Sequence, residues 1–115
     1  MTNQEFNEAI DLLRSKDPMT FEEGFHWLIG FVDEYLDQIT ALMKDELNPD
    51  LRGKFIEVLG YSDDERVIPV LAAELNSQYR DVRFWAHSQL EYFENSKAIQ
   101  IANKYKIEHP NEDWY

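Results

Sequence analysis

The sequence predicts an all-α fold, a short α-solenoid of antiparallel helix pairs with about seven helices. Apolar residues recur at intervals of three and four along most of the chain and seldom at intervals of two. This is the periodicity of helices that bury one face. A second observation is a residue pattern that occurs twice, 31 positions apart. The 115 residues suffice for one domain with a real hydrophobic core.

The duplicated pattern occupies residues 50–75 and 81–106. Asp50-Leu51-Arg52 in the first copy recurs as Asp81-Val82-Arg83 in the second. Similar residues follow at the same shift: Phe55 and Ala86, Leu59 and Leu90, Arg66 and Lys97, Val67 and Ala98, Ile68 and Ile99, Val70 and Ile101. A period of this length is typical of stacked repeats, because one unit cannot bury its apolar face alone. We expect Arg52 and Arg83 to tie neighbouring units through ion pairs and stem packing.

The N-terminal part of the chain predicts two or three helices. Thr2 and Glu5 have the spacing of a capping box, and the stripe that follows consists of Phe6, Ala9, Ile10 and Leu13. Residues 15–18 end this first helix. Thr20 and Glu23 resemble a second capping box, which opens an apolar segment that runs to about Leu47. We expect two helices with a bend near residues 33–35, and one long helix is the alternative.

The remaining helices are bounded by recognisable caps. Asn48 and Pro49 begin a helix that should run to about Tyr61. Residues 62–65 would cap the next helix, which contains Val67 to Leu75. Two further helices are expected at about 79–93 and 96–105, and His109-Pro110 ends the pattern. We therefore expect a single helical domain over residues 1–110 and a polar tail over residues 111–115.

Residues 50–106 resemble two HEAT-like repeats of the short bacterial kind, whose units also occur in phycobilisome-lyase proteins. The residues that carry this resemblance are Asp50-Leu51-Arg52, Leu59 and Gly60 in one first helix, Asp81-Val82-Arg83, Ala86 and Leu90 in the other, and Ile68-Pro69-Val70-Leu71 with Leu75 in a second helix. A weaker third copy, shifted by 28 positions, pairs Trp27 with Phe55 and lacks the Asp-x-Arg signature. The resemblance implies a binding scaffold, and it implies that second helices line the binding side.

Charge and composition narrow the function classes. The net charge is −12, and residues 1–50 carry 12 acidic and only 3 basic side chains. Such a field repels a phosphate backbone and attracts a basic partner, so we expect no nucleic-acid binding. The chain has no cysteine, secretory signal or bilayer-spanning apolar run, and we expect a cytoplasmic location without membrane association.

Catalytic and metal-binding motifs are weak in this sequence. Glu23 and His26 have the spacing of a helical metal pair, and so do His87 and Glu91, but a carboxylate-bridged dimetal site needs more inward ligands. We interpret His87 as a packed or half-exposed histidine. No nucleophile elbow or glycine-rich phosphate loop occurs. We therefore expect a non-catalytic protein without a metal or cofactor.

The best candidates for partner binding are acidic side chains, with a merely solvated face as the alternative. They are Glu22, Glu23, Asp33, Glu34, Asp37 and Glu65. The sequence is similar in character to immunity proteins, which neutralise a basic toxin, so we expect capture of a basic protein partner. The alternatives are an accessory subunit of a pigment- or cofactor-attachment lyase, or a self-associating adaptor. The sequence leaves monomer and homodimer open, and Trp114 and Tyr115 could dock on the last helix pair or insert into a partner.

Overall fold

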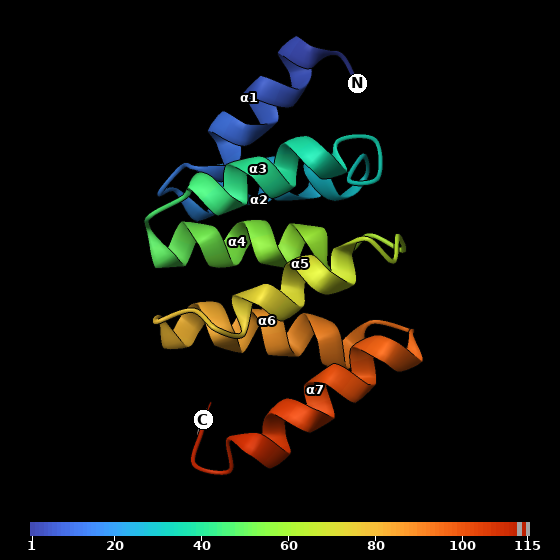
Figure 1. The fold of residues 1–115 in the computed structure, drawn as a ribbon. Helices are drawn as coiled ribbons and strands as arrows, with labels where there is room; N and C mark the ends of the chain where they lie inside the picture. The colour runs from blue at the N-terminus through green and yellow to red at the C-terminus, as the bar shows by residue number, and fades with distance from the viewer. Residues whose placement is uncertain (113, 115) are drawn as a thin grey trace.

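The computed structural model describes residues 1–112 and Trp114, and it contains seven α-helices (Figure 1). They are α1 (Asn3–Leu13), α2 (Pro18–Ile29), α3 (Leu36–Asp45), α4 (Pro49–Leu59), α5 (Val67–Glu74), α6 (Arg80–Tyr92) and α7 (Ser96–Glu108). No strand occurs among these described residues. The predicted all-α class is therefore confirmed.

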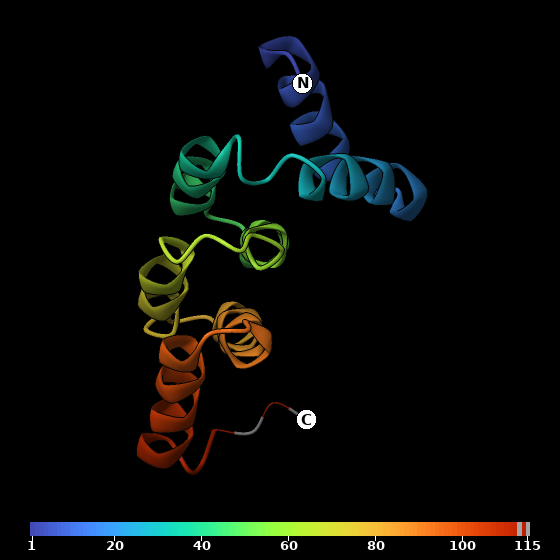
Figure 2. The same cartoon turned by 90° about the vertical axis from the view of Figure 1, so that its right-hand side faces the viewer.

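The helices stack along the longest dimension of the molecule, which is 43 Å. Figure 2 shows α3, α5 and α7 in one layer and α4 and α6 in a second layer beside it. α4 packs against α3 and α6, whereas α6 also packs against α5 and α7. The connecting segments 30–35, 60–66 and 93–95 all lie at one edge of the stack, on the right in Figure 1. This arrangement brings together loops that are about 30 residues apart in sequence.

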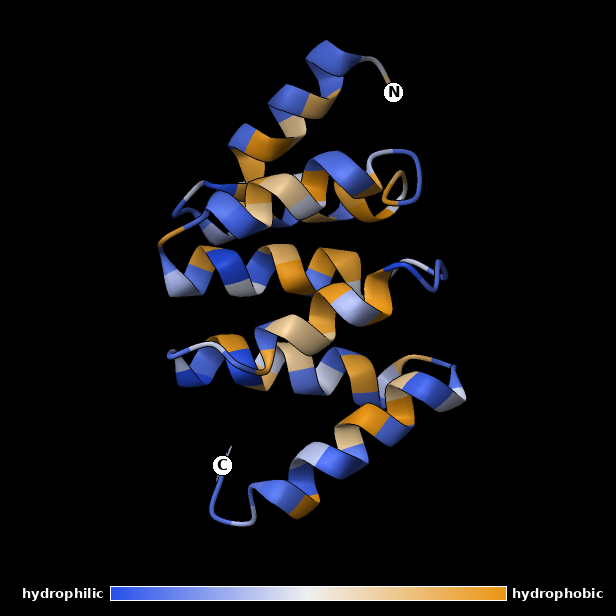
Figure 3. Ribbon diagram, viewed as in Figure 1, coloured by the Kyte–Doolittle hydropathy of each residue, from blue (hydrophilic) through white to orange (hydrophobic). Residues whose placement is uncertain are grey.

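The hydrophobic core runs through the stack, and α4 lies at its centre. Phe55, Ile56, Val58 and Leu59 of α4 have no solvent-accessible surface. The predicted stripe of the first helix is buried as expected. Figure 3 shows hydrophobic residues along the helices and a hydrophilic segment between α4 and α5. Burial of apolar surface is the main force that holds the layers together.

Local capping decides where the N-terminal helices begin. The Thr2 hydroxyl accepts a hydrogen bond from the Glu5 amide at 3.1 Å, and the Glu5 carboxylate accepts one from the Thr2 amide at 3.0 Å. This capping box was predicted. The second predicted box is wrong, because α2 begins at Pro18 and the Asp17 carboxylate accepts from the Thr20 amide at 3.1 Å. Aspartate followed by proline supplies both a cap and a preorganised first residue.

Residues 20–47 form two helices, as expected. α2 ends at Ile29 and α3 begins at Leu36. Between them the Glu34 amide donates to the Phe31 carbonyl at 3.1 Å, and the Tyr35 amide donates to the Val32 carbonyl at 3.3 Å. Val32 and Tyr35 are buried, so the turn is anchored to the core.

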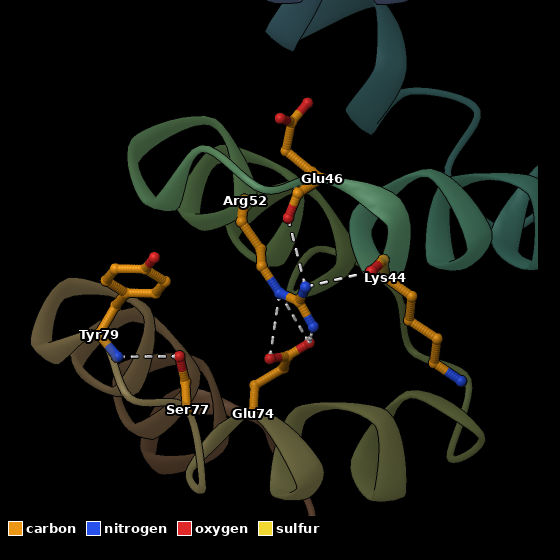
Figure 4. Close-up of polar contacts among 6 residues, drawn as sticks. All are labelled: Lys44, Glu46, Arg52, Glu74, Ser77 and Tyr79. Carbon is orange, nitrogen blue, oxygen red and sulfur yellow. Dashed lines mark hydrogen bonds and ion pairs between the residues drawn. The ribbon is translucent and has the colours of Figure 1, made fainter.

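A half-buried arginine joins α3, α4 and α5 (Figure 4). Arg52 Nη2 lies 2.6 Å from Glu74 Oε1, and Arg52 Nη1 donates to the backbone carbonyls of Lys44 at 3.1 Å and Glu46 at 3.3 Å. The side chains of Arg52 and Glu74 are 24% and 7% exposed. Arg52 does contact the segment before its own copy, but through the Lys44 and Glu46 carbonyls. The expected ion pair between copies is not observed, because Glu74 lies in the same copy, residues 50–75.

Arg83 makes an equivalent tie at the other end of the stack. It donates to the carbonyl of Ser77 at 2.9 Å, and Ser77 follows Glu46 at the 31-residue shift. Its carboxylate partner is Glu112, at 2.6 Å, which also accepts from the Tyr105 hydroxyl at 3.0 Å. The hydrogen bond from Arg83 lowers the pKa of Glu112. The repeated arginine therefore keeps its backbone contact while its carboxylate partner changes.

Removal of the Arg52 guanidinium should destabilise the fold strongly. In Arg52→Met the Glu74 carboxylate would remain buried without a cation, and we expect the free energy of unfolding to fall by about 3 kcal/mol. Urea unfolding followed by circular dichroism measures the change. Arg66→Met is the matched control, because the Arg66 side chain is 64% exposed in its ion pair with Asp64, and exposed ion pairs contribute little to stability. Equal losses of unfolding free energy in the two variants would contradict the role of Arg52 as the counter-ion of buried Glu74.

Gly24 allows the close approach of α1 and α2. A Cβ atom at this position would lie 2.5 Å from the Leu13 backbone nitrogen and 2.7 Å from the Ala9 carbonyl oxygen. Backbone atoms cannot yield as a flexible side chain can, so we expect Gly24→Ala to cost about 2 kcal/mol in unfolding free energy. In the control variant Gly30→Ala the nearest such atom lies at 3.5 Å, and its effect should stay within about 0.5 kcal/mol. Thermal unfolding of both variants tests the comparison.

Candidate functional site

Four of the six predicted binding residues lie at the edge where segments 30–35, 60–66 and 93–95 meet. The Ser62 hydroxyl donates to the Asp33 carboxylate, which joins the first loop to the second. The Asn95 side-chain Nδ2 donates to the Glu65 carboxylate at 2.9 Å and joins the second loop to the third. Asp37, on the first turn of α3, lies 3.8 Å from Arg66. Glu34 is exposed on the same loop as Asp33.

This edge is strongly acidic. We define the acidic edge as residues 30–37, 60–66 and 92–95, which together contain seven carboxylates and one cation, Arg66. Three of the carboxylates were not among the predicted binding residues: Asp63, Asp64 and Glu94. They could not be recognised from the sequence as part of one surface, because their neighbours across the edge lie about 30 positions away. The acidic edge therefore presents a concentrated negative field to an approaching partner.

Arg66 compensates only part of that charge. Its Nη2 lies 2.9 Å from Asp64 Oδ2, and its Nη1 lies 3.8 Å from Asp37 Oδ1. The hydrogen bond to Arg66 lowers the pKa of Asp64, and the same hydrogen bond raises the pKa of Arg66. Asp64 and Arg66 therefore both keep their charges at neutral pH.

The acidic edge also has a recess with aromatic residues at its rim. The recess has a volume of about 480 Å³ and is lined by Gly60, Tyr61, Ser62, Asp63, Glu65, Tyr92, Phe93, Glu94 and Asn95. Tyr61 and Tyr92 are 56% and 82% exposed. Exposed tyrosines beside carboxylates combine apolar contact area with hydrogen-bonding groups, as the central residues of protein interfaces do.

Glu22 and Glu23 lie apart from the acidic edge. Both are exposed on α2, where they line a separate hollow with Met19, Thr20 and His26. The six residues proposed from the sequence therefore belong to two surfaces. Sequence proximity placed them in one run, but α2 directs Glu22 and Glu23 away from the loop that carries Asp33.

His87 is a packed core histidine. It is 1% exposed, its Nε2 lies 3.0 Å from the Ala102 carbonyl oxygen, and its Nδ1 lies 3.5 Å from Glu91. The Nε2 distance fits a donated N–H, which satisfies this buried nitrogen. No group of three or more histidine and carboxylate side chains within the described part of the chain is placed to hold a metal ion.

The Trp114 side chain docks on the last helix pair. The Trp114 ring centroid lies 6.0 Å from that of Phe84, 5.9 Å from that of His87 and 6.1 Å from that of Tyr105. Of the two alternatives for Trp114, docking is therefore the one observed. Tyr115 lies outside the described residues.

A second hollow lies between α2, α4 and α6 and was not foreseen from the sequence. It has a volume of about 290 Å³ and is lined by Phe21, Asp50, Lys54, Glu57, Asp81 and Trp85. Lys54 Nζ lies 4.1 Å from the centroid of the Phe21 ring, within the range of a cation–π contact. Burial raises the pKa of Glu57. No local motif signals this hollow, because its residues come from three separate helices.

Comparisons with protein-family models, with curated proteins and with solved structures find no match to this chain. Among the described residues, no helix combines the length and apolar character needed to cross a membrane.

The raised pKa of Glu57 predicts that this residue destabilises the fold increasingly as the pH rises. Burial disfavours the charged carboxylate in the folded state, so Glu57 lowers stability as the pH rises through the usual carboxyl range and into its raised pKa. Glu57→Gln removes this cost, and we expect it to raise the melting temperature at pH 7. The gain should vanish below pH 4, where the carboxyl is neutral in both states. A variant that is less stable than the parent at pH 7 would contradict this account.

Proposed function

We propose that this protein is a non-catalytic binding module that captures a basic protein partner on its acidic edge in the cytoplasm. The single observation that carries the proposal is the acidic edge itself, where three loops and the first turn of α3 bring together seven carboxylates and only Arg66 as a cation (Figure 1). The cross-loop hydrogen bonds to Asp33 and Glu65 hold this charge in a fixed arrangement. A preorganised surface loses less entropy on binding than a mobile one.

We propose further that the scaffold is a short HEAT-like α-solenoid of antiparallel helix pairs. Two layers of helices support this assignment (Figure 2). So do the equivalent contacts of Arg52 with the Glu46 carbonyl and of Arg83 with the Ser77 carbonyl. In such a scaffold each unit contacts its neighbours alone, and the loops between helices are available to a partner.

The binding mechanism has two stages. The negative field first steers the basic partner towards the acidic edge, which raises the association rate. Tyr61 and Tyr92 then contact the partner around the 480 Å³ recess, where water is displaced and hydrogen bonds form. A toxin whose active site is basic would be inactivated by this contact, so neutralisation of such a toxin, as immunity proteins do, is the biological role that we propose.

Neutralisation of the acidic edge should slow partner association. We expect affinity purification from native cells to recover one basic protein. The triple variant Glu34→Gln/Asp63→Asn/Glu94→Gln should lower its association rate about tenfold at low salt, with a smaller effect at high salt. Biolayer interferometry measures both rates.

The matched control removes three exposed carboxylates away from the acidic edge, as Glu8→Gln/Asp11→Asn on α1 with Asp45→Asn at the end of α3. It changes the net charge equally, and its association rate should stay within about twofold of the parent if local charge steers the encounter. A partner with an acidic surface, or equal slowing in both variants, would overturn the proposed role of the acidic edge. A genome neighbour that encodes a secreted basic toxin would identify the partner to use first.

A further inference from the structure

The hollow between α2, α4 and α6 has the composition of a site for a cationic side chain. Phe21 and Trp85 supply aromatic surface, and Asp50, Glu57 and Asp81 supply carboxylates. The hollow shares no lining residue with the recess of the acidic edge. It is therefore a surface separate from the acidic edge.

Trp85 is held in place by the helix beside it. A Cβ atom at Gly53 would lie 2.8 Å from Trp85 Cδ1, so the indole ring lies directly on the α4 backbone at this glycine. The Phe84 ring meets Trp85 edge-on at a centroid distance of 5.2 Å. A fixed aromatic wall requires little ordering when a ligand binds.

The carboxylates of the hollow are weakly compensated from within the chain. Neither Asp50 nor Glu57 forms an ion pair within the described residues, and Asp81 lies 3.8 Å from Arg80 in an exposed pair. The one cation that lines the hollow, Lys54, lies over the Phe21 ring. The Phe21 ring of the hollow thus already holds one positive charge. The three carboxylates of the hollow still outnumber this cation.

We propose that this hollow binds an arginine side chain of a partner polypeptide, stacked on Trp85 with its guanidinium directed to the carboxylates. The planar guanidinium stacks on aromatic rings and donates in pairs to carboxylates, which an ammonium does less well. The volume of about 290 Å³ suits one side chain and is at the lower limit for a small-molecule site. The inference rests on the proposed function for the basic character of the partner, but it uses different residues.

Other occupants fit the hollow less well. An anion would meet three carboxylates, and an uncharged apolar group would leave Glu57 partly buried without a counter-charge. The raised pKa of Glu57 shows that its charge is already disfavoured by burial in the unliganded chain. A bound cation would reverse that penalty, so arginine binding should release a proton near the raised pKa and weaken in acid.

The test uses two capped tripeptides, Gly-Arg-Gly and Gly-citrulline-Gly, which differ in charge but hardly in shape. The tryptophan indole N–H signals of the full chain are followed by NMR, and Trp85→Phe assigns the Trp85 signal. We expect the arginine peptide to shift the Trp85 signal saturably with millimolar affinity, and the citrulline peptide to bind at least tenfold more weakly. Equal shifts with both peptides, or no saturable shift at Trp85, would overturn the proposal.

Charge variants locate the site. Glu57→Gln/Asp81→Asn should weaken the arginine peptide at least fivefold, whereas Asp63→Asn/Glu94→Gln, with the same loss of charge at the acidic edge, should change its affinity less than twofold. Equal weakening in both variants would show non-specific attraction and would overturn the proposal. Dispersed amide signals in each variant confirm that it remains folded.

The two proposals fail in distinguishable ways. In one outcome a basic partner loses affinity for Glu34→Gln/Asp63→Asn/Glu94→Gln but not for Glu57→Gln/Asp81→Asn, and the arginine peptide does not shift the Trp85 signal. The inferred site is then wrong and the proposed function survives. If the arginine peptide binds at Trp85 and the acidic-edge variant binds the partner normally, the inferred site survives and the proposed role of the acidic edge is wrong.

Discussion

The carboxylate of Glu74 is almost removed from water, and its burial is tolerable only because Arg52 lies against it. The same guanidinium satisfies the carbonyls of Lys44 and Glu46, where the chain leaves α3. One side chain thus fixes the relative positions of three helices. Apolar contacts alone are non-directional and tolerate small shifts, whereas this network fixes the distance and orientation between α3, α4 and α5.

The fixed stacking has a consequence for the opposite edge of the molecule. Loops with like charges would separate if the helices could slide, because carboxylates on neighbouring loops repel one another. The packing of α4 and α6 and the hydrogen bonds to Asp33 and Glu65 oppose that repulsion. The acidic edge therefore keeps its arrangement through the core beneath it and through its own cross-loop hydrogen bonds.

Sequence patterns foresaw the features that depend on near neighbours. The stripe of α1, the capping box at Thr2 and the cap at Asn48 all follow from residues within one or two turns. The cap predicted at Thr20 was wrong, because Asp17 and Pro18 form a stronger helix start three residues earlier. Duplication singled out Arg52, but its partner Glu74 is 22 residues away. The hollow beside Trp85 is formed by three helices. The spacing of apolar residues along one helix does not predict which residues of different helices come together.

Arg83 differs from Arg52 in the source of its carboxylate. Tyr105 occupies the position that Glu74 holds 31 residues earlier, and Glu112, from beyond α7, supplies the carboxylate to Arg83. Trp114 packs against Phe84 of α6. A designed chain with one more copy of the pattern after α7 would therefore need a glutamate at position 105 if Arg83 is to have the kind of partner that Arg52 has.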